Sequence, residues 1–279
     1  MKTKVESIAY RHSTGFEEVV ITEYVKVLNE FGTLLLPQQY VPDYLGGSLK
    51  GIHGDVGNLA KGKLLSSHII KASLPYIKKG SVILDIGAHM GTMSMMFGRY
   101  LSRKGGGEII SVEASPQNYV CAKYNIESNS PENVTNTVLN RVCLTDTTEE
   151  KISFPVHNIK TGLITGQYGY VRPEEAARGY QSLSGQEVLI DLVYKVPSIS
   201  IDSLKLEKVD LIKIDCEGAD LEVIAGGLET IKRYKPALLI EMNNAKKRPQ
   251  EIKKLTSILP GGLIMTPIHA QNDWLLRWD

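Results

Sequence analysis

From about residue 76 onward, short runs of β-branched and other apolar residues alternate with segments in which apolar residues recur at helical spacing. The predicted strands are Val82–Asp85, Glu108–Glu113, Asn136–Leu144, Val209–Asp215 and Ala237–Glu241. The predicted helices are Thr92–Arg103, Gln117–Ser128 and Asp220–Tyr234. Strands that alternate with helices in this way are typical of a parallel sheet covered by helices. We therefore predict an α/β fold with a mostly parallel sheet.

The C-terminal residues follow a different pattern. Gly262–Ile268 and Asp273–Trp278 read as two strands with only a short polar link, His269 to Asn272, between them. Strands joined so closely pair antiparallel, because a parallel connection needs a long crossover. We expect this C-terminal hairpin at an edge of the sheet.

Two segments depart from the simple alternation. Residues 1–75 contain glycine-rich stretches and one helical pattern near Lys63–Leu74, which Pro75 stops, and we interpret them as an N-terminal appendage and a possible cover for the active site. Residues 76–279 then form the main domain, with a long insertion at about 155–196 that follows a strand near Lys151–Phe154. Long loops within compact domains are often functional.

Composition narrows the class of protein. The 32 basic residues balance 31 acidic ones, so the chain lacks the global positive field that favours non-specific nucleic-acid binding, and we expect no nucleic-acid partner. Cys121, Cys143 and Cys216 stand singly, which argues against a disulfide framework and a structural zinc site. Nothing approaches the ~18 consecutive apolar residues of a membrane span. We expect a soluble, cytoplasmic protein with no membrane partner; its oligomeric state cannot be read from the pattern.

The segment Val82–Gly91, VILDIGAHMG, carries the first candidate chemistry. A buried strand ends at Asp85 and a helix opens after Gly91, so Gly87 and Gly91 fall in a tight turn where the backbone can approach a ligand. Glu113 follows about twenty residues later at the end of the next strand, the position from which a carboxylate binds ribose hydroxyls. Together these features predict a nucleoside pocket.

The glycine spacing distinguishes two cofactors. A dinucleotide site needs G-x-G-x-x-G so that the pyrophosphate can rest on the helix N-terminus, whereas this chain reads G-A-H-M-G. Asp85 also places a negative charge before the turn, which would repel a pyrophosphate and attract the α-amino group of a methionine moiety. The pattern favours S-adenosyl-L-methionine over a nicotinamide dinucleotide.

Four blocks then resemble the successive motifs of the FkbM family of methyltransferases: DIGAHMGTMS, VEASPQNY at Val112–Tyr119, LIKIDCEGADLEVIAGG at Leu211–Gly227 and PALLIEMN at Pro236–Asn243. The resemblance covers about residues 76–245, and the KIDCEGAD block is its most specific part. It implies a Rossmann-like class I methyltransferase fold and S-adenosyl-L-methionine as the donor. It also implies O-methylation of sugars or natural products as the typical reaction, with some relatives acting on peptide side-chain nitrogen.

The resemblance also assigns residues to the donor site. Asp85, Gly87, Ala88 and Gly91 would line the methionine end of the donor, and Glu113 would bind its ribose. Ser115 and the Asn140–Arg141 region would lie near the adenine. His89 belongs to the same loop, at a position where the family resemblance leads us to expect asparagine.

Acidic residues after the fourth and fifth strands are the candidates for catalysis. Lys213, Asp215 and Glu217 can share one side of the fourth strand's carboxyl end, because side chains alternate along a strand. Methyl transfer from a sulfonium needs alignment of the reactants and removal of a proton from the acceptor. We take Asp215, which also counts toward the donor site, or Glu217 as the candidate base, and Lys213 as its electrostatic partner.

Glu241 brings a third carboxylate to this edge. Because divalent metal ions take oxygen ligands, three carboxylates could bind one, but nothing else in the sequence supports a metal site. A plainer reading is also open: Lys213 would simply pair with an acid, and Glu217 would cap the following helix.

The favoured function is therefore O-methylation of a hydroxyl on a sugar or natural-product small molecule. N-methylation of a peptide side chain is the first alternative, and a nicotinamide-dependent enzyme or a non-catalytic nucleoside-binding protein is the second. The missing G-x-G-x-x-G motif argues against the nicotinamide enzyme.

Overall fold

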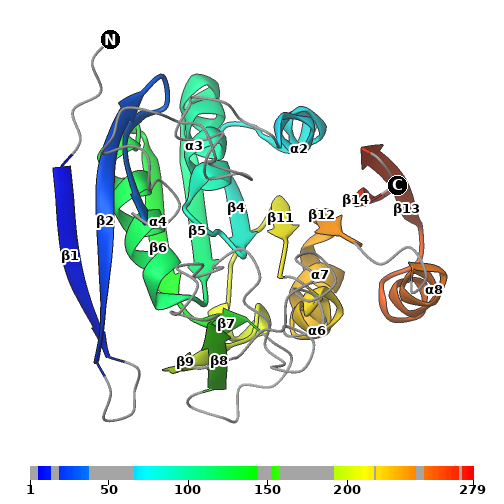
Figure 1. Cartoon of the computed structure of the whole chain (residues 1–279). Coiled ribbons are helices and arrows are strands. Elements are labelled where there is room, and N and C mark those ends of the chain that lie inside the picture. Colours follow the sequence, from blue (N-terminus) through cyan, green and yellow to red (C-terminus); the bar gives the residue numbers. More distant parts are fainter. Residues whose placement is uncertain are drawn as a thin grey trace.

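The structure is a computed structural model, and it describes residues 6–13, 19–37, 66–143, 152–156, 192–216, 218–242, 248–269 and 272–279. Figure 1 shows a curved central sheet seen nearly along its strands, with helices on both of its faces and a separate pair of long strands, β1 and β2, beside it.

The central sheet has seven strands in the order β13-β14-β12-β11-β4-β5-β6. These are β13 (Leu263–His269), β14 (Asp273–Trp278), β12 (Ala237–Glu241), β11 (Leu211–Ile214), β4 (Ser81–Ile86), β5 (Gly107–Glu113) and β6 (Val134–Asn140). The strands from β12 to β6 pair in parallel, whereas β14 and β13 form the antiparallel edge. The predicted Rossmann-like α/β fold with a C-terminal hairpin is confirmed.

Alternating side chains of the parallel strands divide the core between the two faces of the sheet. Ile83 of β4 packs in a cluster with α2 (Ser67–Ser73) and α3 (Thr92–Lys104), while its neighbours Leu84 and Ile86 pack in the opposite cluster. The remaining helices are α4 (Pro116–Asn129), α6 (Asp220–Ala225), α7 (Leu228–Tyr234) and α8 (Arg248–Ile258). Residues of α6, α7 and α8 join the Leu84 cluster. Buried on both faces, the parallel strands read as continuous apolar runs.

A second sheet precedes the first and was not predicted. Its strands β1 (Glu6–Ser13), β2 (Val19–Asn29) and β3 (Gly32–Pro37) pair antiparallel in chain order, and β3 packs on α4. We call them the N-terminal sheet. The helix predicted near Lys63–Leu74 corresponds to α2 and the short 3-10 turn after it, with residues 63–65 outside the described part of the chain. The domain division at residue 75 stays a prediction.

The predicted insertion at about 155–196 is described only at its two ends. There β8 (Ile152–Val156) pairs antiparallel with β9 (Leu192–Val196), while residues 157–191 lie outside the described residues. Next to it, β7 (Val142–Cys143) and β10 (Ser198–Ile199) form a short parallel pair, and a 3-10 turn follows at Asp202–Leu204.

Three further parts of the chain differ from what the sequence pattern predicts. The strand expected at Asn136–Leu144 ends at Asn140, whose side-chain amide donates to the carbonyls of Glu113 and Ala114 where the chain leaves the sheet. The helix expected at Asp220–Tyr234 breaks at Gly226 and Gly227 into α6 and α7. A Cβ on Gly227 would lie 3.0 Å from the Ile201 side chain, which is tighter than an ordinary van der Waals contact. The third is α8, which the sequence pattern did not predict.

Candidate active site

The strand order places a ligand site at the carboxyl end of β4. From β4 the chain proceeds outward to β5 and β6 on one side, and it later returns to build β11 and β12 on the other side. Ligands of open α/β sheets bind at such a switch point, beyond the carboxyl ends of the strands. The loop after β4, Gly87–Gly91, is called the glycine loop below, and it lies next to Asp215, which follows β11.

The glycine loop is packed too tightly for side chains at its two glycines. Gly87 has a φ of 76°, and a Cβ there would lie 1.9 Å from the backbone oxygen of Asp215. The amides of Gly87 and Ala88 both donate to the Val112 carbonyl, at 2.9 and 3.0 Å. At Gly91, a Cβ would lie 2.9 Å from the Ile126 side chain. The loop is thus held against β5, β11 and α4 at once.

His89 occupies the middle of this loop with a φ of 52°, which is uncommon for a residue with a side chain. Its amide donates to the Glu113 Oε2 atom at 2.7 Å. Its Nε2 atom is buried and has no hydrogen-bond partner among the described residues. Burial lowers the pKa of His89 to about 4, so the imidazole is neutral near pH 7.

Glu113, at the end of β5, is 6% exposed and accepts backbone N–H groups from the loops that follow β4 and β5. Besides the His89 amide, the Ser115 amide donates to Oε1 at 2.9 Å. Burial raises the pKa of Glu113 to about 7, although these backbone hydrogen bonds partly counter the rise. The Asn118 side chain also hydrogen-bonds to this carboxylate, so of its roughly four lone-pair positions one is left to accept a ligand hydroxyl.

The residues expected near the adenine lie close to Glu113. Ser115 is the N-cap of α4, and its hydroxyl accepts the Asn118 amide. Arg141 donates its backbone N–H to the Glu113 carbonyl, the same carbonyl that Asn140 contacts. The structure thus brings Ser115, Asn140 and Arg141 together with Glu113, and their contact with an adenine stays a prediction.

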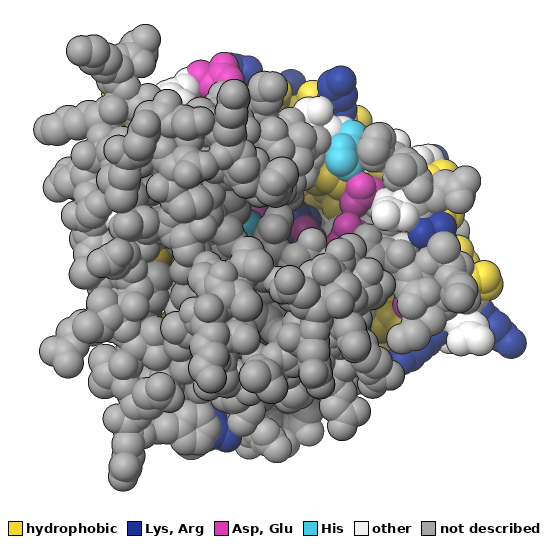
Figure 2. Space-filling model, viewed as in Figure 1, with side chains coloured by type: hydrophobic (Ala, Val, Ile, Leu, Met, Phe, Trp, Pro, Cys, Tyr) yellow, Lys and Arg dark blue, Asp and Glu magenta, His cyan; other side chains and the backbone are white. Residues whose placement is uncertain are grey.

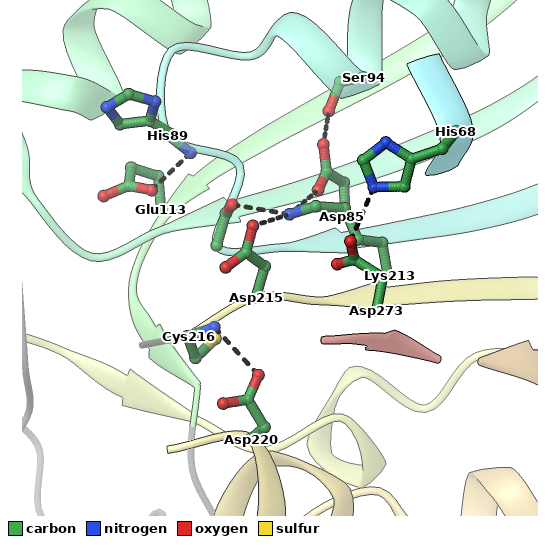
Figure 3. Close-up of polar contacts among 11 residues, drawn as sticks. His68, Asp85, His89, Ser94, Glu113, Lys213, Asp215, Cys216, Asp220 and Asp273 are labelled. Carbon is green, nitrogen blue, oxygen red and sulfur yellow. Dashed lines mark hydrogen bonds and ion pairs between the residues drawn. The ribbon is translucent and has the colours of Figure 1, made fainter. Parts of the chain in front are cut away.

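Asp85 and Lys213 form a buried ion pair beneath the glycine loop (Figure 3). Lys213 Nζ lies 3.3 Å from Asp85 Oδ1 and 3.4 Å from Asp215 Oδ2, and it donates to the Gly87 carbonyl at 3.1 Å. Burial alone would lower the pKa of Lys213, but the two carboxylates outweigh it and raise that pKa. Lys213 therefore pairs with acids, as the plainer reading of the sequence had it.

Asp85 itself has no exposed surface. Its Oδ2 atom accepts the Ser94 hydroxyl at 2.5 Å, and the Ser94 and Ser111 hydroxyls are 2.7 Å apart. Since the single hydroxyl proton of Ser94 goes to Asp85, Ser111 is the donor to Ser94. The Asp85 carboxylate is thus turned toward Lys213 and α3, and its contact with the methionine end of the donor stays a prediction.

More acidic side chains surround the exposed end of β11. The Asp215 side chain is 40% exposed, and the carboxyls of Glu241 and Asp215 are hydrogen-bonded. Burial, and then the charges of Asp215 and Asp273, raise the pKa of Glu241 above its usual range. Burial and the Asp215 charge also raise the pKa of Asp220 to about 6. Glu241 therefore keeps its proton to a higher pH than an ordinary glutamate, and that proton bridges two carboxyls.

Figure 2 shows acidic side chains and a histidine gathered around a hollow on one face of the molecule, with lysine or arginine deeper inside it. In the close-up of Figure 3, His68 and Asp273 lie beside this group, with His68 Nε2 2.7 Å from Asp273 Oδ2. Asp220 accepts the amides of Cys216 and Gly218, which fixes the loop that follows β11.

Most of the predicted site residues therefore meet at one edge of the sheet, but Glu217 lies outside the described residues. The sequence interpretation missed Ser94, Ser111, Asp220 and the His68–Asp273 pair. Asp220 lies in the KIDCEGAD block, so the sequence could have indicated it as a site residue. The pairing of His68 with Asp273 spans 205 positions, and nothing in the local sequence indicates it. Within the described ranges, no group of three or more His, Cys, Asp or Glu side chains is arranged to hold a metal ion.

A model of the methyltransferase FkbM domain matches residues 85–262, which is more than half of the chain. The matched span starts at Asp85 and includes all four sequence blocks that carry the resemblance. No curated protein matches the chain. Among the described residues, no helix is long and apolar enough to cross a membrane.

Solved structures with a similar chain path include three methyltransferase-related proteins. The FkbM methyltransferase of Methylobacillus flagellatus KT is 17% identical with a TM-score of 0.42; the match covers 71% of this chain but 44% of that one, less than half its length. Precorrin-6y C5,15-methyltransferase from Geobacter metallireducens GS-15 is 12% identical, with coverages of 77% and 90% and a TM-score of 0.42. Aeropyrum pernix fibrillarin with bound S-adenosyl-L-methionine is 14% identical, with coverages of 92% and 94% and a TM-score of 0.40. Likenesses this low carry no argument about activity.

Proposed function

The chain belongs to the FkbM methyltransferase family, and on that premise we propose that it transfers a methyl group from S-adenosyl-L-methionine to a hydroxyl of a sugar or natural-product small molecule. The single observation that carries the choice of a hydroxyl is the hydrogen-bonded carboxyl pair of Asp215 and Glu241 beside the glycine loop. A hydroxyl must lose its proton as it is methylated, and a carboxylate at the acceptor can take it.

The residues at the switch point suit a nucleoside donor. The glycine loop lies at the carboxyl end of β4, and Glu113 beside it has a lone pair left for a ribose hydroxyl. The neutral His89 ring has a buried nitrogen without a hydrogen-bond partner among the described residues. The donor would supply a methyl group already activated on a sulfonium. The protein's own part is then to hold donor and acceptor in line and to take up the acceptor's proton.

Asp215 is the carboxylate best placed for that proton. Its side chain is 40% exposed, whereas Asp85 is fully buried, so an acceptor can reach only the former. Lys213, fixed on three sides by Asp85, Asp215 and the Gly87 carbonyl, would hold the Asp215 carboxylate in place. The role of Lys213 would then be positional, without a proton transfer of its own.

The proposal is tested by incubating the protein with methyl-labelled S-adenosyl-L-methionine and a panel of sugars and hydroxylated natural products. We expect label on a hydroxyl oxygen, formation of S-adenosylhomocysteine, and binding of S-adenosylhomocysteine but not of NAD in a thermal-shift assay. Folded protein that fails to bind S-adenosylhomocysteine would overturn the donor assignment. Label found only on the side-chain nitrogen of peptides would overturn the choice of a hydroxyl acceptor and keep the donor.

Donor binding should also depend on pH through Glu113. Ribose hydroxyls donate to the ionised carboxylate, and because the pKa of Glu113 is about 7, the ionised fraction drops between pH 8 and pH 6. The affinity for S-adenosylhomocysteine should therefore fall about tenfold over this interval, in proportion to the competent fraction. Isothermal titration calorimetry at several pH values measures it.

The matched control is Glu113→Gln, which cannot titrate. It should bind S-adenosylhomocysteine more weakly than the native chain at pH 8 and with no change in affinity down to pH 6. A pH dependence that survives in this variant would assign the titration to another group.

A further inference from the structure

The N-terminal sheet shares a hydrophobic core with the glycine loop. One cluster of buried side chains joins β2, β3 and the turn between them to α3, α4 and the loop itself; it contains Tyr24, Val27, Phe31, Leu34, Leu35, Leu36, Met90, Met95, Cys121, Ala122 and Ile126. Met90 is 1% exposed and belongs to the glycine loop. The loop that would face the methyl donor on one side is thus packed against the N-terminal sheet on the other.

Asn125 of α4 is the polar link inside this core. It is fully buried, and its Oδ1 atom accepts the Leu35 amide at 2.5 Å, as a neighbouring strand would. One Nδ2 proton goes to the Leu35 carbonyl at 3.1 Å and the other to the Met90 carbonyl at 2.9 Å. One side chain therefore ties the edge of β3 to the glycine loop with all of its hydrogen-bonding groups in use.

We propose that Asn125 is a positioning residue for the donor site, through which the N-terminal sheet holds the glycine loop in its binding conformation. The inference rests on the proposed function, because it concerns the same donor site. The side-chain hydrogen bonds of Asn125 go to Leu35 and to Met90 and to none of the groups expected to contact the donor, so Asn125 acts through the Met90 carbonyl. The loop needs such support because His89 is held at a positive φ, which costs free energy that surrounding contacts must offset.

The chain contains a matched control one helical turn away. Asn129 donates to the Thr33 carbonyl at 2.9 Å, so it also fastens β3 to α4. Its other described bond, to the Asn125 carbonyl, lies within the helix, and neither bond reaches the glycine loop. A merely structural role in docking the N-terminal sheet would be shared by both asparagines, whereas a positioning role belongs to Asn125 alone.

The experiment compares Asn125→Ser and Asn125→Asp with Asn129→Ala. Serine removes both donated bonds, and aspartate keeps the acceptor for Leu35 but cannot donate to either carbonyl, so at least one variant should fold. We expect both Asn125 variants to bind S-adenosylhomocysteine about tenfold more weakly than the native chain, while the acceptor KM stays unchanged. Asn129→Ala should bind S-adenosylhomocysteine with native affinity.

Amide hydrogen exchange tests the link without any ligand. The amides of His89 and Gly91 should exchange about tenfold faster in the Asn125 variants and at the native rate in Asn129→Ala. Native affinity and exchange in both Asn125 variants, or equal losses in Asn129→Ala, would overturn the proposal. If the native chain binds no S-adenosylhomocysteine, the proposed function fails, and the exchange rates still decide whether Asn125 holds the loop.

Discussion

Asparagine in place of Asp215 should lower kcat for methyl transfer by at least about a hundredfold, because general bases contribute factors of this size. The amide has nearly the same shape as the carboxylate, and its oxygen can still accept from Lys213, which keeps its buried partner Asp85. Since asparagine keeps the shape of the side chain and an oxygen acceptor, donor affinity should stay within about twofold of the native value, and the loss should fall on kcat. Single-turnover rates with labelled donor, together with calorimetric titration of S-adenosylhomocysteine, measure the two quantities separately.

Glu241→Gln is the matched control for this experiment. Glutamine can still donate a hydrogen bond to Asp215, as the protonated Glu241 does, so activity near neutral pH should change little. Since the raised pKa of Glu241 means that its proton is lost only at higher pH, any change in rate that accompanies this loss should disappear in the variant. A loss of activity in Glu241→Gln as large as that in Asp215→Asn would point to Glu241 as the base.

Replacing Lys213 with methionine should destabilise the fold by about 3 to 5 kcal/mol, the usual cost of leaving one member of a buried ion pair without its partner. Asp85 is fully buried and the Lys213 side chain is 8% exposed, so water cannot replace the lost charge. Methionine has about the length of the lysine stem, which limits the loss of packing. Urea denaturation measures the difference in the free energy of unfolding.

Two further variants separate burial from charge. Lys208 also pairs with an aspartate, Asp210 at 3.3 Å, but half of its side chain is exposed, so Lys208→Met should cost less than about 1 kcal/mol. The double variant Asp85→Asn with Lys213→Met removes both buried charges and should recover much of the stability. If the single Lys213 variant were as stable as the native chain, the ion pair would have no part in holding the switch point together.

The parts of the fold that could be predicted are those in which burial leaves a recognisable pattern of apolar residues in the local sequence. Strands β4, β5 and β12 were placed within a residue or two because both faces of a central parallel strand are covered, which produces unbroken apolar runs. The break between α6 and α7 could not be predicted in the same way. It depends on Ile201, which lies against Gly227 but far from it in sequence.

The N-terminal sheet was missed for a related reason. Among the described residues, the free edge of β3 contacts the Asn125 side chain and no further strand, and that contact crosses 90 positions. The segment Val19–Val27 is rich in β-branched residues, which is a local signal of a strand. That composition favours a strand at β2, whereas nothing local indicates how β3 is completed.

For the candidate site, the sequence predicted which residues lie together better than it predicted the surroundings of each. Asp85, Glu113, Lys213, Asp215 and Glu241 do meet at the switch point, because the ends of parallel strands share one edge. Which carboxylate is buried and which is exposed follows from the neighbours of each, such as Ser94 and Ser111 around Asp85. Those neighbours come from separate elements, so composition and spacing cannot reveal them.

The positive φ of His89 limits which residue types fit at this position. Besides glycine, the residues that adopt this conformation most readily are asparagine, aspartate and histidine. Asparagine, which the family resemblance suggests at position 89, belongs to this small set of residue types. The histidine present here belongs to it as well. The backbone thus limits which side chains fit, and within that set this chain has an aromatic ring that stays uncharged near neutral pH.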